Sequence, residues 1–286
     1  MTTSVVIPAY NGWEYLSKNL PAVLALGADE VIVVDDGSTD GTAGKIVKKF
    51  PGVHLLIHPK NSRFPISVND GFSQAAGDIV FLINQDVTPD KNLISQVLPF
   101  FKSPDVFAVT FNERHDSYAV AEMSDGFLHY SNGPLSNTPH RSFWASGGGS
   151  AFRKSVWDGL GGFDPIFSPG YYEDLDLGWR ARRRGYEIIW APKAVISHVR
   201  ETAFNAAFKP GELTRIKERN YLFCHWKNLN TGNLAFHFRS IFLRCLKNPG
   251  FARPVLMALS VLPRIISFRR REKNYLKRSD YEVFAV

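Results

Sequence analysis

Over its first 84 residues the chain alternates short continuous apolar runs with longer stretches whose apolar residues recur at helical spacing. A continuous apolar run is typical of a strand buried on both faces, and the helical spacing is typical of an amphipathic helix. The pattern predicts strands at 4–7, 30–35, 53–58 and 79–84, and helices at 14–26, 42–50 and 65–76. This alternation predicts an α/β fold with a doubly wound, mostly parallel sheet.

Polar residues follow three of the predicted strands at the point where each strand ends. They occupy positions 8–12, 35–41 and 84–86, and each segment taken alone also fits an ordinary turn. Because doubly wound sheets bind ligands beyond the carboxyl ends of their strands, the three segments together indicate a binding site. There Asp36 can accept hydrogen bonds from a base or ribose, and Tyr10 can stack on the base. The sequence contains neither the dinucleotide GxGxxG fingerprint nor a P-loop.

Basic residues are concentrated near the end of the chain. The formal net charge of the 286 residues is +7; segment 236–278 contributes eleven Lys or Arg against the single acid Glu272, or +10, which leaves −3 elsewhere. Helical apolar spacing predicts helices at 211–226, 234–246 and 254–268, the last broken by Pro263. Short, basic, apolar helices favour an anionic membrane surface. The alternative is a helical subdomain packed on the body, with its basic residues solvated.

Composition places the chain among ordinary globular proteins, with 44% hydrophobic and 21% charged residues. Disordered, collagen-like and disulfide-rich classes are thereby excluded. Cys224 and Cys245 form neither a zinc pattern nor a disulfide framework, which favours a reducing compartment. The N-terminus lacks the basic segment of a signal peptide, and no apolar run approaches the roughly 20 residues that span a bilayer. We therefore expect a cytoplasmic protein.

Seven short segments, in this order and spacing, resemble one known family. They are residues 8–11, 35–38, 61–69, 84–86, 161–164, 172–177 and 194–198. The set is similar to the family-2 glycosyltransferases of GT-A fold, and most of all to the bacterial rhamnosyltransferase-like branch that builds cell-surface polysaccharides. The resemblance extends over roughly the first 200 residues. It implies a Rossmann-like GT-A domain that binds a nucleoside diphosphate sugar.

The resemblance also implies which residues bind the donor. It places Pro8, Tyr10 and Asp36 around the nucleoside, and Arg63 near the diphosphate. The full set of implied nucleotide-sugar residues is Pro8, Tyr10, Asn11, Asp35, Asp36, Arg63, Asn69 and Gln85.

A divalent cation, Mn²⁺ or Mg²⁺, is implied beside the diphosphate, where it would neutralise the charge of the leaving group. The family usually presents a D-x-D-like set of carboxylates here, but this chain has Asn84-Gln85-Asp86 and so a single acid. One carboxylate is a poor site for a hard cation. His198 matches a family position that can complete the coordination sphere, and an imidazole ligand favours Mn²⁺. The implied metal ligands are therefore Asp86 and His198.

The acids at the start of a predicted helix, Glu173 to Arg184, are the candidate catalytic groups. An inverting transfer needs a carboxylate that takes the proton of the acceptor hydroxyl. By resemblance this base is Asp174, with Glu173 orienting it or contacting the acceptor. Acids in a first helical turn are also favoured by the helix dipole alone. Asp176 lies on a different helix face and is interpreted as structural.

The expected organisation is a GT-A catalytic domain at 1–210, with a nucleotide-sugar half at about 1–110 and an acceptor half at about 111–210, followed by the basic helical tail at 211–286. Residues 112–141 show no clear periodicity and are interpreted as a loop insertion. Gly147–Gly149 is expected to let the backbone approach the sugar closely.

The sequence therefore predicts an inverting glycosyltransferase that moves a sugar from a nucleoside diphosphate to a hydroxyl of a glycan or lipid-linked acceptor. We expect it on the inner face of the cell membrane, held there by the basic tail. One alternative is a sugar-nucleotide binder without catalytic activity, which the single acid at 84–86 keeps open. A second alternative is a nucleic-acid-binding protein, but the sequence contains no known DNA- or RNA-binding motif. The chain lacks the Gly-rich loop of a nucleotidyltransferase and the membrane-spanning helices of a processive synthase.

Overall fold

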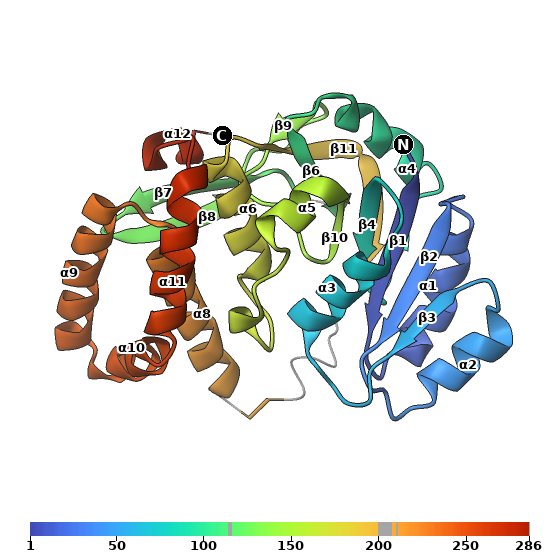
Figure 1. Ribbon diagram of the computed structural model, residues 1–286, viewed down its shortest axis with the longest axis horizontal. Helices are drawn as coiled ribbons and strands as arrows, with labels where there is room; N and C mark the ends of the chain where they lie inside the picture. The colour runs from blue at the N-terminus through green and yellow to red at the C-terminus, as the bar shows by residue number, and fades with distance from the viewer. Residues whose placement is uncertain (114–115, 200–207, 210, 286) are drawn as a thin grey trace.

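A nine-stranded sheet forms the centre of the structure (Figure 1). The computed structural model describes residues 1–113, 116–199, 208–209 and 211–285. The strand order is β3-β2-β1-β4-β10-β6-β11-β5, with β9 paired to β11. The strands are β1 (Thr3–Ala9), β2 (Glu30–Asp35), β3 (His54–Ile57), β4 (Ile79–Ile83), β5 (Val87–Pro89), β6 (Val106–Glu113), β9 (His140–Arg141), β10 (Gly149–Arg153) and β11 (Glu187–His198).

The first half of the sheet is parallel, as the alternation of strands and helices predicts. β3, β2, β1 and β4 run parallel, whereas β10 is antiparallel to both β4 and β6. The sequence predicts that β1 ends before Pro8, but the strand continues through Pro8. The strand can include the proline because β4 pairs with β1 only as far as Val6. At Pro8 only β2 pairs with β1, through Val34, so the missing N–H of the proline breaks no hydrogen bond to β4.

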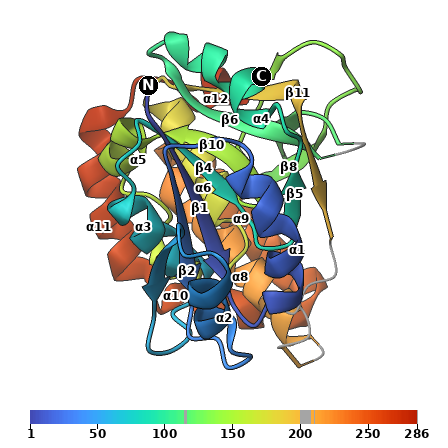
Figure 2. The ribbon, with the colours of Figure 1, turned by 90° about the vertical axis from the view of Figure 1, so that its right-hand side faces the viewer.

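Helices cover both faces of the parallel strands. Alternate residues of β1 enter two different cores: Val5 and Ile7 contact the helix at residues 13–24, and Val6 contacts the helix at 64–74. Figure 2 shows these helices, α1 and α3, on opposite sides of the sheet. The helices of this part of the chain are α1 (Trp13–Leu24), α2 (Thr42–Lys49), α3 (Phe64–Gln74), α4 (Leu93–Val97), η1 (Leu98–Lys102), α5 (Lys154–Leu160), η2 (Pro165–Phe167) and α6 (Glu173–Arg183).

The interpretation of residues 112–141 as a loop insertion is wrong in its central part, which is a β-hairpin. β7 (Ala119–Ser124) pairs with β8 (Phe127–Asn132) in antiparallel register. Asp125 and Gly126 form the two-residue turn, with φ of 53° and 80°. Both central residues of a type I′ turn need positive φ, and Asp-Gly is a favoured pair for it. The hairpin contributes Ala121 and Leu128 to a third hydrophobic core.

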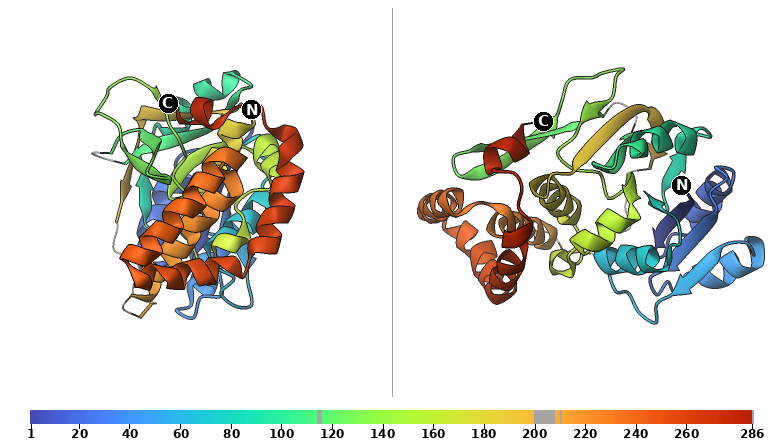
Figure 3. Two further views of the ribbon diagram at one scale, coloured as in Figure 1. Left: turned by 90° about the vertical axis from the view of Figure 1, so that its left-hand side faces the viewer. Right: turned by 45° about the horizontal axis from the view of Figure 1, so that its top comes forward.

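The C-terminal helices complete this third core and lie at the far side of the molecule from β3 (Figure 3). They are α8 (Glu212–Asn228), α9 (Thr231–Lys247), η3 (Pro249–Phe251), α10 (Ala252–Leu259), α11 (Leu262–Glu272), η4 (Lys273–Tyr275) and α12 (Asp280–Phe284). The single helix predicted at 254–268 is in fact two, and Pro263 lies in the first turn of α11, where no helical hydrogen bond is lost. The expected domain boundary at residue 210 lies outside the described residues.

The C-terminal helices differ in how much of their surface is buried. Nine of the seventeen residues of α8 are buried, so α8 is a core helix and fits the subdomain interpretation. α9 has the same length but buries only His237 and Ile241. Among the described helices none is alone both long and apolar enough to cross a bilayer; residues 249–259 and 262–275, bent by 63°, meet those criteria only as a pair.

Candidate functional site

A cavity of about 340 Å³ lies beyond the carboxyl ends of β1, β2 and β4. The segments that line it come from distant parts of the chain: the ends of the three strands, the start of α3, the glycine segment before β10 and the start of α6. From these segments the residues that line the cavity are Pro8, Ala9, Tyr10, Asp36, Arg63, Phe64, Asn84, Gln85, Asp86, Gly147, Gly148, Glu173 and Asp174. The structure thus has a cavity at the sheet edge where the polar residues after the strands predict a binding site.

Asp36 lines the cavity and also holds the loop that closes one side of it. Its Oδ1 accepts a hydrogen bond from the Ser62 amide at 2.7 Å and lies 2.8 Å from Nδ1 of His58. Its Oδ2 accepts a hydrogen bond from the Arg63 amide at 2.9 Å. These bonds hold Arg63 at a φ of 82°, an uncommon conformation for a residue with a side chain. The carboxylate therefore fixes the position of Arg63 in the cavity wall.

Tyr10 and Gln85 meet across the cavity edge, although they are 75 residues apart. Oε1 of Gln85 accepts a hydrogen bond from the Tyr10 amide at 3.1 Å. The close approach depends on Gly12, because a Cβ at that position would lie 2.1 Å from Gln85 Oε1. The Tyr10 side chain remains 38% exposed and can take a ligand ring.

Three of the eight implied nucleotide-sugar residues do not line the cavity, and neither does the implied metal ligand His198. Asn11 accepts a hydrogen bond from the Thr39 amide, and Asp35 accepts one from the Ser38 amide. Asn69 pairs with the backbone of Phe163 through both its Oδ1 and its Nδ2, at 2.9 and 2.7 Å. These three side chains hold the turns around the cavity.

Asp86 and His198 form a pair at the end of β4 and β11. Nε2 of His198 lies 3.1 Å from Asp86 Oδ1, and its Nδ1 lies 3.5 Å from Glu113 Oε1. Burial alone would lower the pKa of His198, but the hydrogen bonds and charges of Asp86 and Glu113 outweigh it and raise the pKa to about 9. Without a ligand, the imidazole is thus a cation between two carboxylates.

The same corner of the cavity contains an unsatisfied oxygen. Asn84 lines the cavity, and its Oδ1 is buried with no hydrogen-bond partner among the described residues. Asn84 and His198 approach Gly148 from two sides, since a Cβ there would lie 3.4 Å from an atom of each. A buried orphan oxygen beside a carboxylate and an imidazole suits a hard cation that a ligand's own oxygens help to hold. The described part of the chain contains no cluster of three His, Cys, Asp or Glu that could hold a metal unaided.

Glu173 is buried and Asp174 half-buried at the start of α6, and their environments differ. Asp174 accepts amide hydrogen bonds from Gly147 (3.0 Å) and Leu175 (2.8 Å), whereas Oε2 of Glu173 has no partner among the described residues. Burial raises both pKa values, that of Glu173 well above its usual range, with the charge of Asp174 as a second cause. Of the two, Asp174 is therefore the better anion, and Glu173 is the easier to protonate.

Glu173→Gln is expected to stabilise the protein more at high pH than at low pH. The folded-state pKa of Glu173 is raised, so its contribution is complete below the unfolded value of about 4.3 and is lost as the pH rises through the folded pKa. Glutamine does not titrate. The Tm difference between variant and wild type should grow by about 3 °C or more between pH 5 and pH 8. A difference that is constant over this range contradicts the assignment of a protonated Glu173.

The loop before α6 is part of the site that the sequence analysis missed. Tyr171 and Tyr172 line the cavity, each with a φ of 74°. Asn220 of α8, fully buried, donates through Nδ2 to the carbonyl oxygens of Phe167, Gly170 and Tyr171 at 2.8 to 3.1 Å. This clamp maintains a backbone that would otherwise be unfavourable. The C-terminal helices thus help to shape the cavity.

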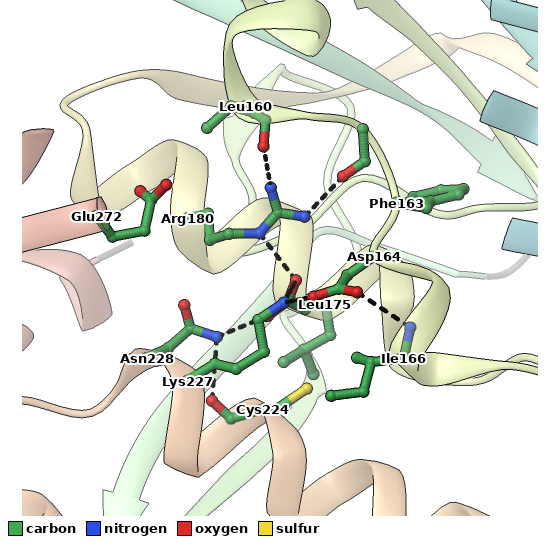
Figure 4. Close-up of polar contacts among 12 residues, drawn as sticks. Leu160, Phe163, Asp164, Ile166, Leu175, Arg180, Cys224, Lys227, Asn228 and Glu272 are labelled. Carbon is green, nitrogen blue, oxygen red and sulfur yellow. Dashed lines mark hydrogen bonds and ion pairs between the residues drawn. The ribbon is translucent and has the colours of Figure 1, made fainter. Parts of the chain in front are cut away.

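Asp176 does not line the cavity, which confirms its structural interpretation. Figure 4 shows the buried cluster of charges that holds α6 against α8. Asp176 accepts hydrogen bonds from Arg180 (2.8 Å), Lys227 (2.9 Å) and Asn228 (2.8 Å). Nζ of Lys227 also donates to Asp164 at 2.7 Å. The side chains of Asp176 and Lys227 are both 0% exposed, so neither charge is compensated by water.

Known proteins resemble this chain in sequence and in fold. The pre-mycofactocin glycosyltransferase of Mycobacterium tuberculosis is 28% identical over 209 residues, which cover 70% of this chain and 43% of that protein. The N-acetylglucosaminyl-diphospho-decaprenol L-rhamnosyltransferase of the same organism is 27% identical over 236 residues, covering 68% of this chain and 75% of that protein. This chain thus spans less than half of the first relative.

Among solved structures, that of GalNAc-T7 with UDP, GalNAc and Mn²⁺ has a TM-score of 0.66 at 16% identity, over 79% of this chain and 48% of that one. This likeness confirms the GT-A-like fold. A sequence model described as "Glycosyltransferase like family 2" matches residues 2–211. That match includes every residue that lines the cavity and so, with the fold, shows that the chain belongs to the family-2 glycosyltransferases.

Proposed function

We propose that the cavity binds a nucleoside diphosphate sugar and that the protein transfers the sugar to an acceptor hydroxyl with inversion. One observation carries the proposal: Asp36, Asp86 and Asp174, from distant segments, line a single cavity of about 340 Å³. A volume of this order suits a nucleotide-sized ligand. Asp36 and Tyr10 are the groups for the nucleoside, Arg63 for the diphosphate, and Asp174 for the reacting hydroxyl.

Asp174 is the proposed general base. In the transfer, the acceptor oxygen forms a bond with the anomeric carbon, the bond from that carbon to the diphosphate oxygen breaks, and the hydroxyl proton passes to Asp174. The two amide hydrogen bonds that Asp174 accepts favour its anionic form and oppose the effect of burial. Each of its oxygens retains a lone pair for the acceptor. Glu173, protonated, can donate a hydrogen bond to a sugar or acceptor oxygen.

The divalent cation, Mn²⁺ or Mg²⁺, is proposed at Asp86 and His198. Its role is to neutralise the charge that develops on the diphosphate. The orphan Oδ1 of Asn84 supports this position and adds an oxygen to the two implied ligands. His198 must lose its proton to act as a ligand. The Mn²⁺ in the structure of GalNAc-T7 is consistent with the choice of cation.

The proposed acceptor is a glycan or a lipid-linked saccharide in the synthesis of a cell-surface polysaccharide or glycolipid. The relative named as an N-acetylglucosaminyl-diphospho-decaprenol L-rhamnosyltransferase supports a lipid-linked acceptor. An acceptor of this kind lies in a membrane, so we place the protein at the inner face of the cell membrane.

Calorimetric titration with UDP, dTDP and GDP, each with and without Mn²⁺, tests the donor site. One nucleotide should bind, and Mn²⁺ should tighten its binding. Asp86→Ala should remove most of the Mn²⁺ enhancement, by tenfold or more in Kd, while binding without metal persists. Asp158→Ala, which changes a half-exposed acid on α5, is the matched control and should behave as wild type. Equal Mn²⁺ enhancement in both variants would refute the metal position.

A further inference from the structure

The C-terminal helices expose an unusual amount of apolar surface on one side of the molecule. On α9 the exposed fractions are 47% for Phe236, 63% for Phe242 and 64% for Leu246. Residues 239, 242, 243 and 246 are three or four positions apart and so share one helix face. α10 also exposes apolar side chains, namely Leu256, which is 67% exposed, and Leu259. We call the exposed apolar residues of α9 and α10 the apolar face: Phe236, Phe238, Phe242, Leu243, Leu246, Leu256 and Leu259.

Basic residues surround the apolar face, and acids are absent from it. No Asp or Glu occurs anywhere from Thr231 to Arg271. Arg239 shares the exposed side of α9, Lys247 is the last residue of α9, and Arg253 is the second residue of α10. These three are exposed and form no ion pair with any residue that the structure describes. The region therefore offers positive charge together with apolar side chains.

Other basic residues of the tail are already used inside the fold. Arg269 donates hydrogen bonds to the carbonyl oxygens of Trp226 and Lys227, and Arg244 stacks on Phe251 at 4.1 Å. Exposed positive charge is thus available to a partner around the apolar face and also at Arg270, Arg271, Lys273 and Lys277.

The end of α9 that leads into α10 lies at the same end of the molecule as the cavity. β1 begins at the top of Figure 1 and ends at the bottom, where its last residues line the cavity. The chain passes from the end of α9 into α10 at that lower end, and Figure 3 agrees. A flat surface laid against the junction of α9 and α10 would therefore lie at the same end of the molecule as the cavity.

We propose that the apolar face, with Arg239, Lys247 and Arg253, docks on an anionic lipid bilayer. Apolar side chains enter the boundary between headgroups and acyl chains, while neighbouring Arg and Lys pair with anionic headgroups. Two features favour a membrane over a protein partner: the complete absence of acids over 41 positions (231 to 271), and long basic side chains that can extend from an apolar surface to headgroups. The docking itself does not depend on the enzymatic activity. Its use, presenting the cavity to a lipid-linked acceptor, rests on the proposed function.

Flotation of the full chain with vesicles tests this docking. Wild type should float with vesicles of phosphatidylcholine and phosphatidylglycerol and should remain free with phosphatidylcholine alone. Phe242→Ser combined with Leu246→Ser should weaken the partition at least about tenfold, because both side chains are mostly exposed and enter the lipid. Arg239→Gln combined with Lys247→Gln should weaken it by about fivefold per charge.

Matched controls come from α2, at the opposite side of the molecule. Val47→Ser removes an apolar side chain that is 63% exposed, as Phe242 is, and Lys48→Gln removes an exposed charge. Both should float as wild type does. Equal losses for the α2 and α9 variants, or no flotation of wild type, would overturn the proposal. A dimer in light scattering that Phe242→Ser with Leu246→Ser dissolves, without any vesicle binding, would assign the face to a second copy instead.

The same variants separate this proposal from the proposed function. Nucleotide binding measured by calorimetry should be unchanged in all of them, since none of the altered residues lines the cavity. Loss of flotation with intact nucleotide binding supports the docking face alone. Intact flotation without nucleotide binding in wild type would leave the docking standing and refute the donor site.

Discussion

Replacing Asp174 by asparagine should lower kcat by about a thousandfold, within the range of 10² to 10⁴ that a general base contributes. Asparagine keeps the size of the side chain and can still accept one amide hydrogen bond, but it cannot take the proton of the acceptor hydroxyl. Donor binding should change little, because the residues implied for the nucleoside come from the ends of β1 and β2 and not from α6. Release of nucleoside diphosphate from the donor in the presence of acceptor measures kcat.

The pH dependence of wild type gives an independent check of this base. Since burial raises the pKa of Asp174, the rate should fall on the acid side at a pH above the ordinary aspartate value of about 3.9. Asp158→Asn, on the surface of α5, should retain the wild-type rate and pH profile. A rate for Asp174→Asn within tenfold of wild type would exclude Asp174 as the base.

Lys227→Met should destabilise the protein by about 3 to 5 kcal/mol, the usual cost of removing one partner from a buried ion pair. Lys227 contacts both Asp164 and Asp176, so its loss leaves Asp176 with Arg180 alone as a cationic partner. Burial by itself raises the pKa of Asp164, and the charge of Lys227 is what holds this pKa below its usual value. Without the lysine, that carboxylate should become easier to protonate. Urea unfolding at neutral pH measures the loss.

Lys18→Met is the matched control for this variant. The Lys18–Glu14 pair has an N–O distance of 3.0 Å, similar to the pairs of Lys227, but its side chains are 67% and 77% exposed. Exposed pairs contribute about 0 to 1 kcal/mol, so Lys18→Met should be nearly neutral. A similar, small effect for both variants would show that the buried cluster in Figure 4 does not hold α6 against α8.

The parallel half of the fold could be predicted because its strands are buried on both faces. Such strands must be continuously apolar, as 31–34 and 79–83 are, and the polar residues directly after them then identify the ligand edge. The hairpin at 119–132 was missed although its Asp125-Gly126 turn is a strong local signal. Its strands are short and half exposed, with small residues such as Ala119 and Ala121 facing the core, so their alternation is weak.

The site was predictable only in part, for a related reason. Asp36, Asp86 and Asp174 follow strands or begin a helix, so topology alone brings them together. The contribution of Asn220 depends on the packing of α8 against the loop at 167–171, a contact between segments about 50 residues apart. No local pattern encodes such a contact. Likewise, the basic residues of the tail divide into buried and exposed groups only once the helices pack.

A transfer assay with the wild-type protein tests the central claim most directly. The protein is incubated with Mn²⁺, with sugars of the nucleoside diphosphate that binds, and with polyprenyl-diphosphate-linked glycans. The account predicts nucleoside diphosphate and an acceptor extended by one sugar, with the anomeric configuration opposite to that of the donor, as seen by NMR. A nucleotide sugar that binds at the cavity but is transferred to no glycan acceptor and not to water, or a product that retains the donor configuration, would contradict the account.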